Sequence, residues 1–144
     1  MRGDHRPGEP LRRLRLAVAV AAAAFRIAVR ERRCRFDVLV PLLRQGQPLA
    51  QPLQDPVALA RFVRRLIPYL PPFGMGRCLK RSLLLLHLWS RCGLAPVLHI
   101  GVAGVGGPRR AHAWLTVEDP ALVDLAGCPA GTVETVRFAA RPSP

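Results

Sequence analysis

Three residues of this 144-residue chain, Cys78, His112 and Asp124, carry side chains that together could perform acyl transfer. Cys78 precedes a long apolar run, which predicts that it stands at a helix start, where the helix dipole favours the thiolate. An imidazole beside that sulfur can carry the proton, and a carboxylate can hold the imidazole in one tautomer. The backbone N–H of Cys78 would be one oxyanion donor, and a second is expected from Met75–Arg77. The pattern therefore indicates nucleophilic attack on a carbonyl through a thioester.

Each of these residues also has a structural interpretation when it is taken alone. A cysteine at a buried helix start often serves as a small apolar residue, and a strand histidine often packs in a core. Asp124 adds a geometric condition. A two-residue turn at Asp119-Pro120 would put it opposite Leu115, on the strand face that His112 does not share. The triad therefore requires a longer connection or a bulge between Thr116 and Pro120, and Pro120 disfavours a tight hairpin.

The rest of the chain divides into helices followed by strands. A helix is predicted over about 11–33, then a short helix or extended piece and a loop over 34–54. Asp55-Pro56 is a helix start, with Asp as N-cap and Pro at the first helical position. A further helix over 78–92 ends at Gly93. Strand patterns cover 97–102, 111–117 and 121–125, and 133–138 is expected as an edge strand or a docked tail. This order predicts an α+β fold with an antiparallel sheet.

The domain prediction is a flexible N-terminus over 1–10 and a single domain over 11–144, with helices in 11–92 and the sheet in 96–138. Apolar spacing predicts which faces pack. In the first helix these residues are Leu11, Leu14, Val18, Phe25 and Val29. The helix that begins at Cys78 is expected to be buried except for a polar strip of Lys80, Leu84, His87 and Arg91. Alternation places His112, Trp114 and Thr116 on one strand face.

The formal net charge is +13, and Lys80 is the only lysine. Such a surface attracts polyanions, acidic peptides or anionic lipid, but solubility together with an Arg-rich composition is the favoured explanation of the charge. Four cysteines without a CxxC pair give no disulfide framework, so reduced thiols and a cytoplasmic location are expected. The run Leu16–Ala24 imitates a signal peptide, but Arg26 and Arg30 end it too early for a membrane span, so no stable membrane insertion is expected.

Five short motifs in a fixed order resemble the lasso-peptide maturation proteases, the B-proteins, which carry a transglutaminase-like, papain-related cysteine peptidase domain. The motifs are Cys78-Leu79-Lys80-Arg81-Ser82-Leu83, Gly93-Leu94-Ala95-Pro96, Ile100-Gly101-Val102, Ala111-His112-Ala113-Trp114 and Val123-Asp124. Their order and spacing match the family pattern, and the Arg- and Leu-rich helices before Cys78 are also similar.

The resemblance implies a papain/transglutaminase-like fold, with N-terminal helices on a small antiparallel sheet and the nucleophile at the start of a buried helix. It implies that Cys78 is the nucleophile, His112 the base and Asp124 the orienting acid, without a cofactor or metal. The implied reaction removes the leader from a ribosomally made precursor. The chain resembles the split form, which implies a separate leader-recognition protein as partner, together with an ATP-dependent lasso cyclase.

Three alternatives remain open from the sequence. A transglutaminase-like acyl transferase would use the same three residues and pass the acyl group to an amine. A small basic nucleic-acid-binding protein would explain the charge but none of the motifs, so no nucleic-acid partner is expected. A metal site could be drawn from Cys78, Cys92, His99, His112 and Cys128, but their spacings match no zinc template. Outside the triad, His99 is expected at a strand edge, His87 in solvent and Arg81 in a salt bridge.

Overall fold

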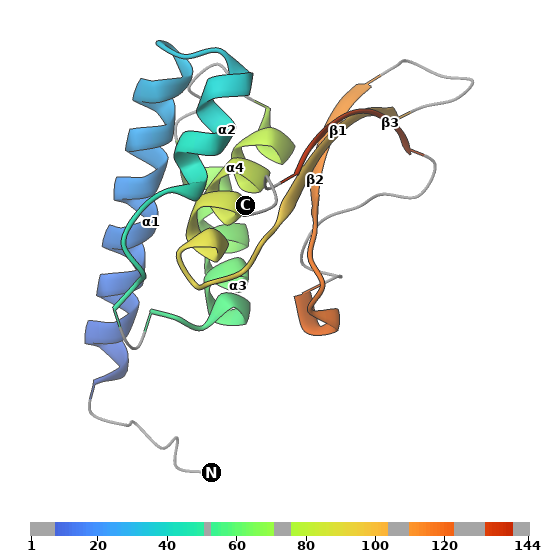
Figure 1. The fold of residues 1–144 in the computed structure, drawn as a ribbon. Coiled ribbons are helices and arrows are strands. Elements are labelled where there is room, and N and C mark those ends of the chain that lie inside the picture. Colours follow the sequence, from blue (N-terminus) through green and yellow to red (C-terminus); the bar gives the residue numbers. More distant parts are fainter. Residues whose placement is uncertain (1–7, 51–52, 71–75, 104–109, 123–131, 140–144) are drawn as a thin grey trace.

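Four α-helices and a three-stranded sheet make up the described part of the chain, which in this computed structural model comprises residues 8–50, 53–70, 76–103, 110–122 and 132–139. The helices form one group and the sheet curves away beside them (Figure 1). The elements are α1 (Glu9–Glu31), α2 (Phe36–Arg44), α3 (Pro56–Leu66), α4 (Arg77–Ser90), β1 (Val97–Ala103), β2 (Arg110–Thr116) and β3 (Thr132–Phe138), with short 3-10 turns η1 (Ile67–Tyr69) and η2 (Pro120–Leu122).

The sheet is antiparallel with strand order β2-β1-β3, so β1 is central and β3 is an edge strand. The predicted α+β architecture is therefore confirmed, and so is the edge-strand interpretation of 133–138. The segment predicted as a strand over 121–125 is not one in its described part, because Ala121 and Leu122 belong to η2. Residues 123–125 lie outside the described residues.

Local sequence explains where the helices begin and end. The Asp55 side chain accepts a hydrogen bond from the Ala58 N–H at 3.0 Å, which caps α3 as predicted. Gly93 adopts φ +84° after α4, a conformation that residues other than glycine rarely adopt, and Leu94 N–H then donates to the Trp89 carbonyl. Residues 1–7 of the expected flexible N-terminus lie outside the described residues, while Glu9 and Pro10 already belong to α1.

Helix α4 is the centre of the molecule, in contact with α1, α2, α3, β1 and β2. Its middle is a continuous buried run from Ser82 to Trp89, because neighbours cover it from several sides. The Trp89 side chain is fully buried, and its indole N–H donates to the Pro56 carbonyl at 3.0 Å, which fixes α4 against the start of α3. The prediction that Cys78 lies at the start of a buried helix is confirmed.

The predicted polar strip on α4 is wrong. Lys80 and His87 are each only 4% exposed, and Leu84 is fully buried. Lys80 Nζ donates to the Leu70 carbonyl at 3.2 Å, and His87 Nδ1 donates to the Leu43 carbonyl at 2.8 Å. Polar groups thus line the buried helix because backbone carbonyls at the ends of neighbouring segments accept from them.

The predicted packing face of α1 is also wrong. Leu11, Leu14, Val18 and Phe25 are each more than half exposed. The opposite face packs instead, through Leu16, Val20, Ala23, Ala24, Ile27 and Ala28. The middle of this helix is apolar all round, so spacing alone does not separate its faces, and the small alanines allow close helix packing. Within the described residues, no helix is both long enough and apolar enough to cross a bilayer.

Candidate active site

Cys78 is the second residue of α4, and its side chain is partly exposed. The N-cap residue Gly76 has no side chain to cap the N–H groups of the first turn. A Cβ atom at Gly76 would lie 4.0 Å from Cys78 Sγ, so the sulfur lies just beside the N-cap. The thiol is therefore accessible, and it is next to backbone N–H groups that have no acceptor within the helix.

His112 is the third residue of β2 and is half-buried. Its ring stacks on Trp114, with ring centroids 6.3 Å apart and an angle of 22° between the planes. Ala113, between these two residues, and Leu115, after them, belong instead to the buried core on the side of the helices. The predicted alternation, with His112 and Trp114 on the face opposite Ala113 and Leu115, is confirmed.

One hydrogen bond joins the Cys78 helix to the His112 strand. Ser82 Oγ, buried one helical turn after Cys78, donates to the carbonyl of Ala113 at 3.0 Å. Ser82 is four residues from Cys78, which is about 6 Å along the helix axis, and Ala113 is the neighbour of His112. The bond therefore fixes the first turns of α4 against the strand that carries the imidazole.

Gly101 lies directly opposite His112 in the β1–β2 pair. A Cβ at this position would lie 2.3 Å from the Val133 carbonyl oxygen and 2.9 Å from the Trp114 ring. The absence of a side chain thus allows β3 to approach β1 and the indole to lie across Gly101. The glycine of the Ile-Gly-Val motif is needed for close packing beside His112.

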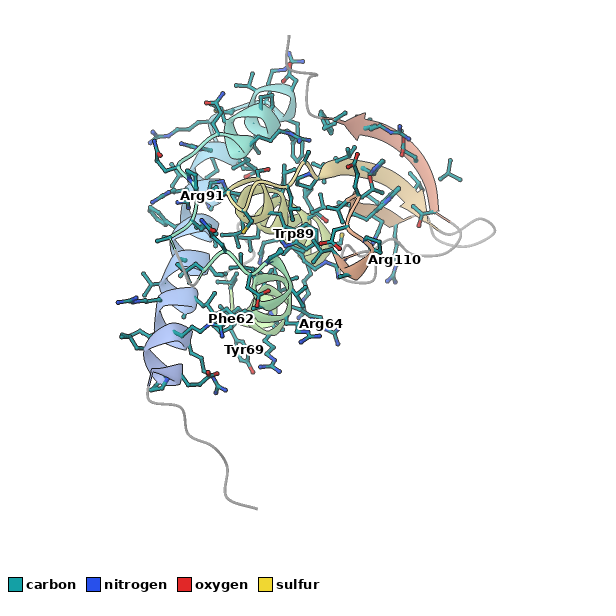
Figure 2. The ribbon with its side chains drawn as sticks, turned by 60° about the horizontal axis from the view of Figure 1, so that its bottom comes forward. Phe62, Arg64, Tyr69, Trp89, Arg91 and Arg110 are labelled. Carbon is teal, nitrogen blue, oxygen red and sulfur yellow. The ribbon has the colours of Figure 1, made fainter. Side chains whose placement is uncertain are left out.

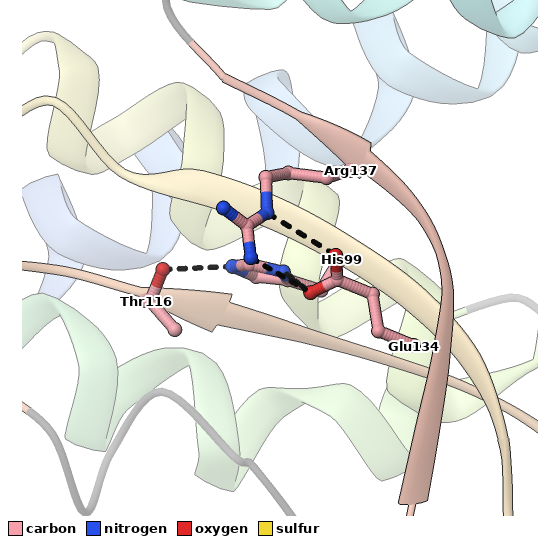
Figure 3. Close-up of polar contacts among 4 residues, drawn as sticks. All are labelled: His99, Thr116, Glu134 and Arg137. Carbon is pink, nitrogen blue, oxygen red and sulfur yellow. Dashed lines mark hydrogen bonds and ion pairs between the residues drawn. The ribbon is translucent and has the colours of Figure 1, made fainter.

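A polar cluster lies on the same sheet face, where Thr116, His99 and Glu134 form a continuous chain across all three strands (Figure 3). His99 Nδ1–H donates to the Glu134 carboxylate, and His99 Nε2 lies 2.8 Å from Thr116 Oγ1. The His99 ring stacks on Trp114 with centroids 5.4 Å apart and an angle of 10°. Trp114 therefore contacts both imidazoles.

The expectation that His99 occupies a strand edge is wrong, because it lies on the central strand and is only 4% exposed. A bulge in β3 brings its carboxylate partner to the correct face. Ile100 pairs with Val136 and Gly101 with Glu134, so Thr135 is the extra residue. Without it, Glu134 would point to the other side of the sheet. Pairing the strand patterns could have placed His99 next to Trp114, but nothing in the sequence signals the bulge.

The His99 contact also sets the ionisation of Glu134. The pKa of Glu134 lies below its ordinary value, mainly because His99 donates a hydrogen bond to the carboxylate. Arg137 adds to this effect, with its Nε 3.2 Å from the second carboxylate oxygen. Glu134 is therefore an ionised acceptor at neutral pH.

Asp124 lies outside the described residues, as do Cys128 and Met75. The structure therefore brings the segments of Cys78 and His112 together, and it does not describe Asp124. The two-residue turn at Asp119-Pro120, which would put Asp124 on the wrong strand face, does not form. Pro120–Leu122 form a 3-10 turn, so the chain does not return along β2 through a two-residue hairpin.

Arg81, one turn after Cys78, was expected to form a salt bridge. It forms none within the described residues, and its Nε is buried without a hydrogen-bond partner. Cys34, Cys78 and Cys92 are free thiols. Burial raises the pKa of the Cys92 thiol to about 11, although Arg91 partly offsets it. In the described segments, no three His, Cys, Asp or Glu side chains lie close enough together to hold a metal ion.

Comparison with known proteins assigns the chain to a family. The family model described as the transglutaminase-like superfamily matches residues 16–133, from the second turn of α1 to the start of β3. No curated protein and no solved structure matches the chain significantly. The match covers most of the chain and includes Cys78, His112 and Asp124. The chain therefore belongs to the transglutaminase-like superfamily.

Proposed function

We propose that this protein is a cysteine peptidase that removes the leader from a ribosomally synthesised lasso-peptide precursor. Membership of the transglutaminase-like superfamily supports cysteine-based acyl chemistry, since this fold is that of cysteine peptidases and acyltransferases. The narrower assignment depends on the five motifs that run from Cys78 to Asp124. A reduced cytoplasmic compartment, which would keep the cysteines as thiols, is part of the proposal.

The proposed reaction has two half-reactions. In the first, the Cys78 sulfur attacks the carbonyl carbon of the scissile peptide bond, and His112 accepts the thiol proton. The C–N bond then breaks, the leaving amine takes that proton from His112, and the leader remains on Cys78 as a thioester. In the second, His112 takes a proton from water, the resulting hydroxide equivalent attacks the thioester, and the thiol is released with its proton.

The residues have distinct duties in this scheme. The uncapped N–H groups at the start of α4 would stabilise the negative oxygen of the tetrahedral intermediate. Asp124 would orient His112 and stabilise the imidazolium, as the resemblance implies. Trp114 would hold the imidazole plane by stacking, and the Thr116–His99–Glu134 chain would hold Trp114.

The observation that carries the proposal is the bond from Ser82 to the Ala113 carbonyl. Ser82 lies one turn after the accessible thiol of Cys78, and Ala113 follows His112 on β2. The bond therefore joins the helix of the thiol to the strand of the histidine. A buried cysteine without such a connection would fit a purely structural role better.

The test is cleavage of a leader-bearing precursor in the presence of a separate leader-recognition protein, followed by mass spectrometry. Wild-type chain should release leader and core peptide, and Cys78→Ala should abolish release while the fold is retained. Cys34→Ala, a change at another partly buried free thiol, is the matched control and should cleave normally. Normal cleavage by Cys78→Ala would refute the proposal.

The proposed partners are the precursor leader, the recognition protein and the ATP-dependent lasso cyclase that closes the freed core. If the recognition protein delivers the leader, its omission should reduce cleavage at low precursor concentration more than at saturation, because binding rather than chemistry is lost.

The superfamily assignment equally supports a second candidate, a transglutaminase-like acyl transferase. In that case an amine rather than water would capture the thioester on Cys78. Incubation of an acyl donor with a labelled amine separates the two candidates. Labelled amide product indicates transfer, and free acid indicates hydrolysis.

A further inference from the structure

A basic cleft lies between the first turns of α1 and the length of α3, away from the elements that carry Cys78 and His112. Its volume is about 280 Å³, and it is open to solvent. Four arginines, Arg12, Arg13, Arg61 and Arg65, share it with an apolar floor of Leu16 and Phe62. Figure 2 shows Phe62 on the side of α3 that faces α1, whereas Arg64 projects from the other side of the same helix.

The charges in this basic cleft are poorly compensated. Glu9 pairs with Arg13 at 3.2 Å, and Asp55 reaches Arg12 at 3.6 Å. Arg61 and Arg65 form neither a hydrogen bond nor an ion pair within the described residues. They are exposed and four residues apart on one helix face, where like charges repel. An anionic group between them would relieve this repulsion.

Arg12 also keeps unused hydrogen-bonding capacity in the cleft. Its guanidinium contacts Asp55 through one nitrogen at 3.6 Å, and its Nε has no hydrogen-bond partner within the described residues. Guanidinium groups bind carboxylates with two parallel hydrogen bonds.

The shape and floor of the cleft favour one class of anion. Leu16 is almost fully buried and Phe62 is partly buried. A bound segment would therefore meet apolar side chains at the bottom of the cleft and arginines around them. The volume suits one or two side chains and not a nucleic-acid backbone, which needs a long cationic track with exposed stacking surfaces. An acidic polypeptide segment with an apolar side chain between its carboxylates fits both features.

We propose that the basic cleft between α1 and α3 docks an acidic segment of a partner polypeptide. The proposal goes beyond the proposed peptidase activity, because none of the cleft residues takes part in that chemistry. A binding measurement therefore tests it, and the result of that measurement does not depend on which acyl reaction Cys78 performs.

The test uses the full chain and a short fluorescein-labelled peptide that carries several Glu residues around a central Leu. Binding is followed by fluorescence anisotropy at about 0.15 M salt, where the screening length is about 8 Å. The test variant is Arg61→Glu with Arg65→Glu. The matched control is Arg15→Glu with Arg64→Glu, which changes the net charge equally at exposed positions outside the cleft. A peptide with Gln in place of each Glu and a single-stranded oligodeoxynucleotide of equal charge complete the set.

The proposal predicts that the acidic peptide binds and that the Gln peptide does not. The cleft variant should weaken binding about tenfold or more, the effect of losing at least one charge-assisted hydrogen bond. The control variant should lose less than about threefold, since remote exposed charges are screened. Equal losses in both variants, no binding by wild type, or tighter cleft-dependent binding of the oligodeoxynucleotide would each overturn it.

Discussion

Cys78 and Cys92 show how the environment of a residue decides its chemistry. Cys78 is accessible at the beginning of α4, beside N–H groups that lack intrahelical acceptors. Cys92 follows the end of the same helix, where burial raises its pKa to about 11. A thiol with that pKa is almost entirely protonated at neutral pH and is a poor nucleophile. The two ends of one helix therefore place one thiol at a partly exposed position beside unpaired N–H groups and the other in a buried position that opposes ionisation.

Glu134→Gln tests the polar cluster behind Trp114. The pKa of Glu134 is lowered from its ordinary value of 4.5, so its ionised form stabilises the fold. Wild type should therefore unfold at higher urea than the variant above that pH. The gap should close as the pH falls below 4.5 and the folded carboxylate becomes protonated. Urea titrations at several pH values measure this.

Glu118→Gln is the control for that experiment, because Glu118 is an exposed carboxylate outside the cluster. It should change stability little at any pH. A gap between wild type and Glu134→Gln that stays constant from neutral to acidic pH would contradict an ionised Glu134 held by His99.

At the scale of elements, the junction between α4 and β2 is the feature that the proposed chemistry requires. Ser82→Ala removes the side-chain hydrogen bond that joins α4 to β2 and leaves the Ala113 carbonyl with one partner fewer. The free energy of unfolding should fall by about 1–2 kcal/mol, the usual effect of deleting one buried partner. Precursor cleavage should fall as well, because Cys78 and His112 lose a common anchor.

Ser90→Ala gives the matched comparison, since the Ser90 Oγ bond in the described part of the chain goes to the Leu86 carbonyl of the same helix. This change should spare cleavage even if it costs some stability. Equal effects of the two serine variants on cleavage would show that the bond between α4 and β2 has no special role.

Gly101→Ala tests the approach of β3 to the central strand. The new Cβ would meet the Val133 carbonyl oxygen at 2.3 Å, and a backbone atom cannot move away as a flexible side chain can. Overpacking of this kind costs about 1–3 kcal/mol. Thermal unfolding measures the loss, with Gly76→Ala as control because its backbone is extended and the nearest atom to a new Cβ would be Cys78 Sγ, at an ordinary contact distance of 4.0 Å. Equal melting temperatures for wild type and Gly101→Ala would contradict this packing.

Element ends were predictable from sequence because single residues determine them. Asp55 caps α3 with its own side chain, and Gly93 ends α4 through a positive φ angle. The faces of β2 followed from simple alternation. The packing face of α1 could not be predicted in this way, because Leu and Ala residues occur all around the helix and only the tertiary contacts choose between its sides.

Within the candidate site, the positions of Cys78 and His112 on their elements could be predicted, but their surroundings could not. Burial of His87 depends on the Leu43 carbonyl of α2, which is distant in sequence. The His99 cluster depends on a one-residue bulge in β3, and β-bulges carry no reliable sequence signal. Long-range partners therefore limit prediction more than local propensity does.

At the scale of the whole molecule, a buried neutral histidine makes stability depend on pH. The pKa of His87 is lowered from 6.5, mainly by burial and further by neighbouring cations such as Arg91, although the hydrogen bond to the Leu43 carbonyl partly offsets this. Its Nε2 is buried without a hydrogen-bond partner, so a protonated ring would bury an unpaired N–H. Below pH 6.5 the unfolded chain binds a proton that the folded chain does not. The free energy of unfolding should then fall by up to about 1.4 kcal/mol per pH unit.

His87→Leu should flatten this dependence between neutral and mildly acidic pH. It should also lower stability at neutral pH, because the Leu43 carbonyl loses its donor. Urea unfolding of both proteins across that range measures the slopes, and identical slopes would contradict the assignment of the acid sensitivity to His87.

The account as a whole depends on one relation, an imidazole on β2 that activates the thiol at the start of α4. Its most direct test is the rate at which iodoacetamide alkylates each cysteine near pH 6, resolved by mass spectrometry, in wild type and in His112→Gln. Cys78 should react at least about tenfold faster than Cys92, the internal control, and the His112 variant should slow Cys78 by about tenfold. A Cys78 rate that matches Cys34 and is unchanged in His112→Gln would contradict the account.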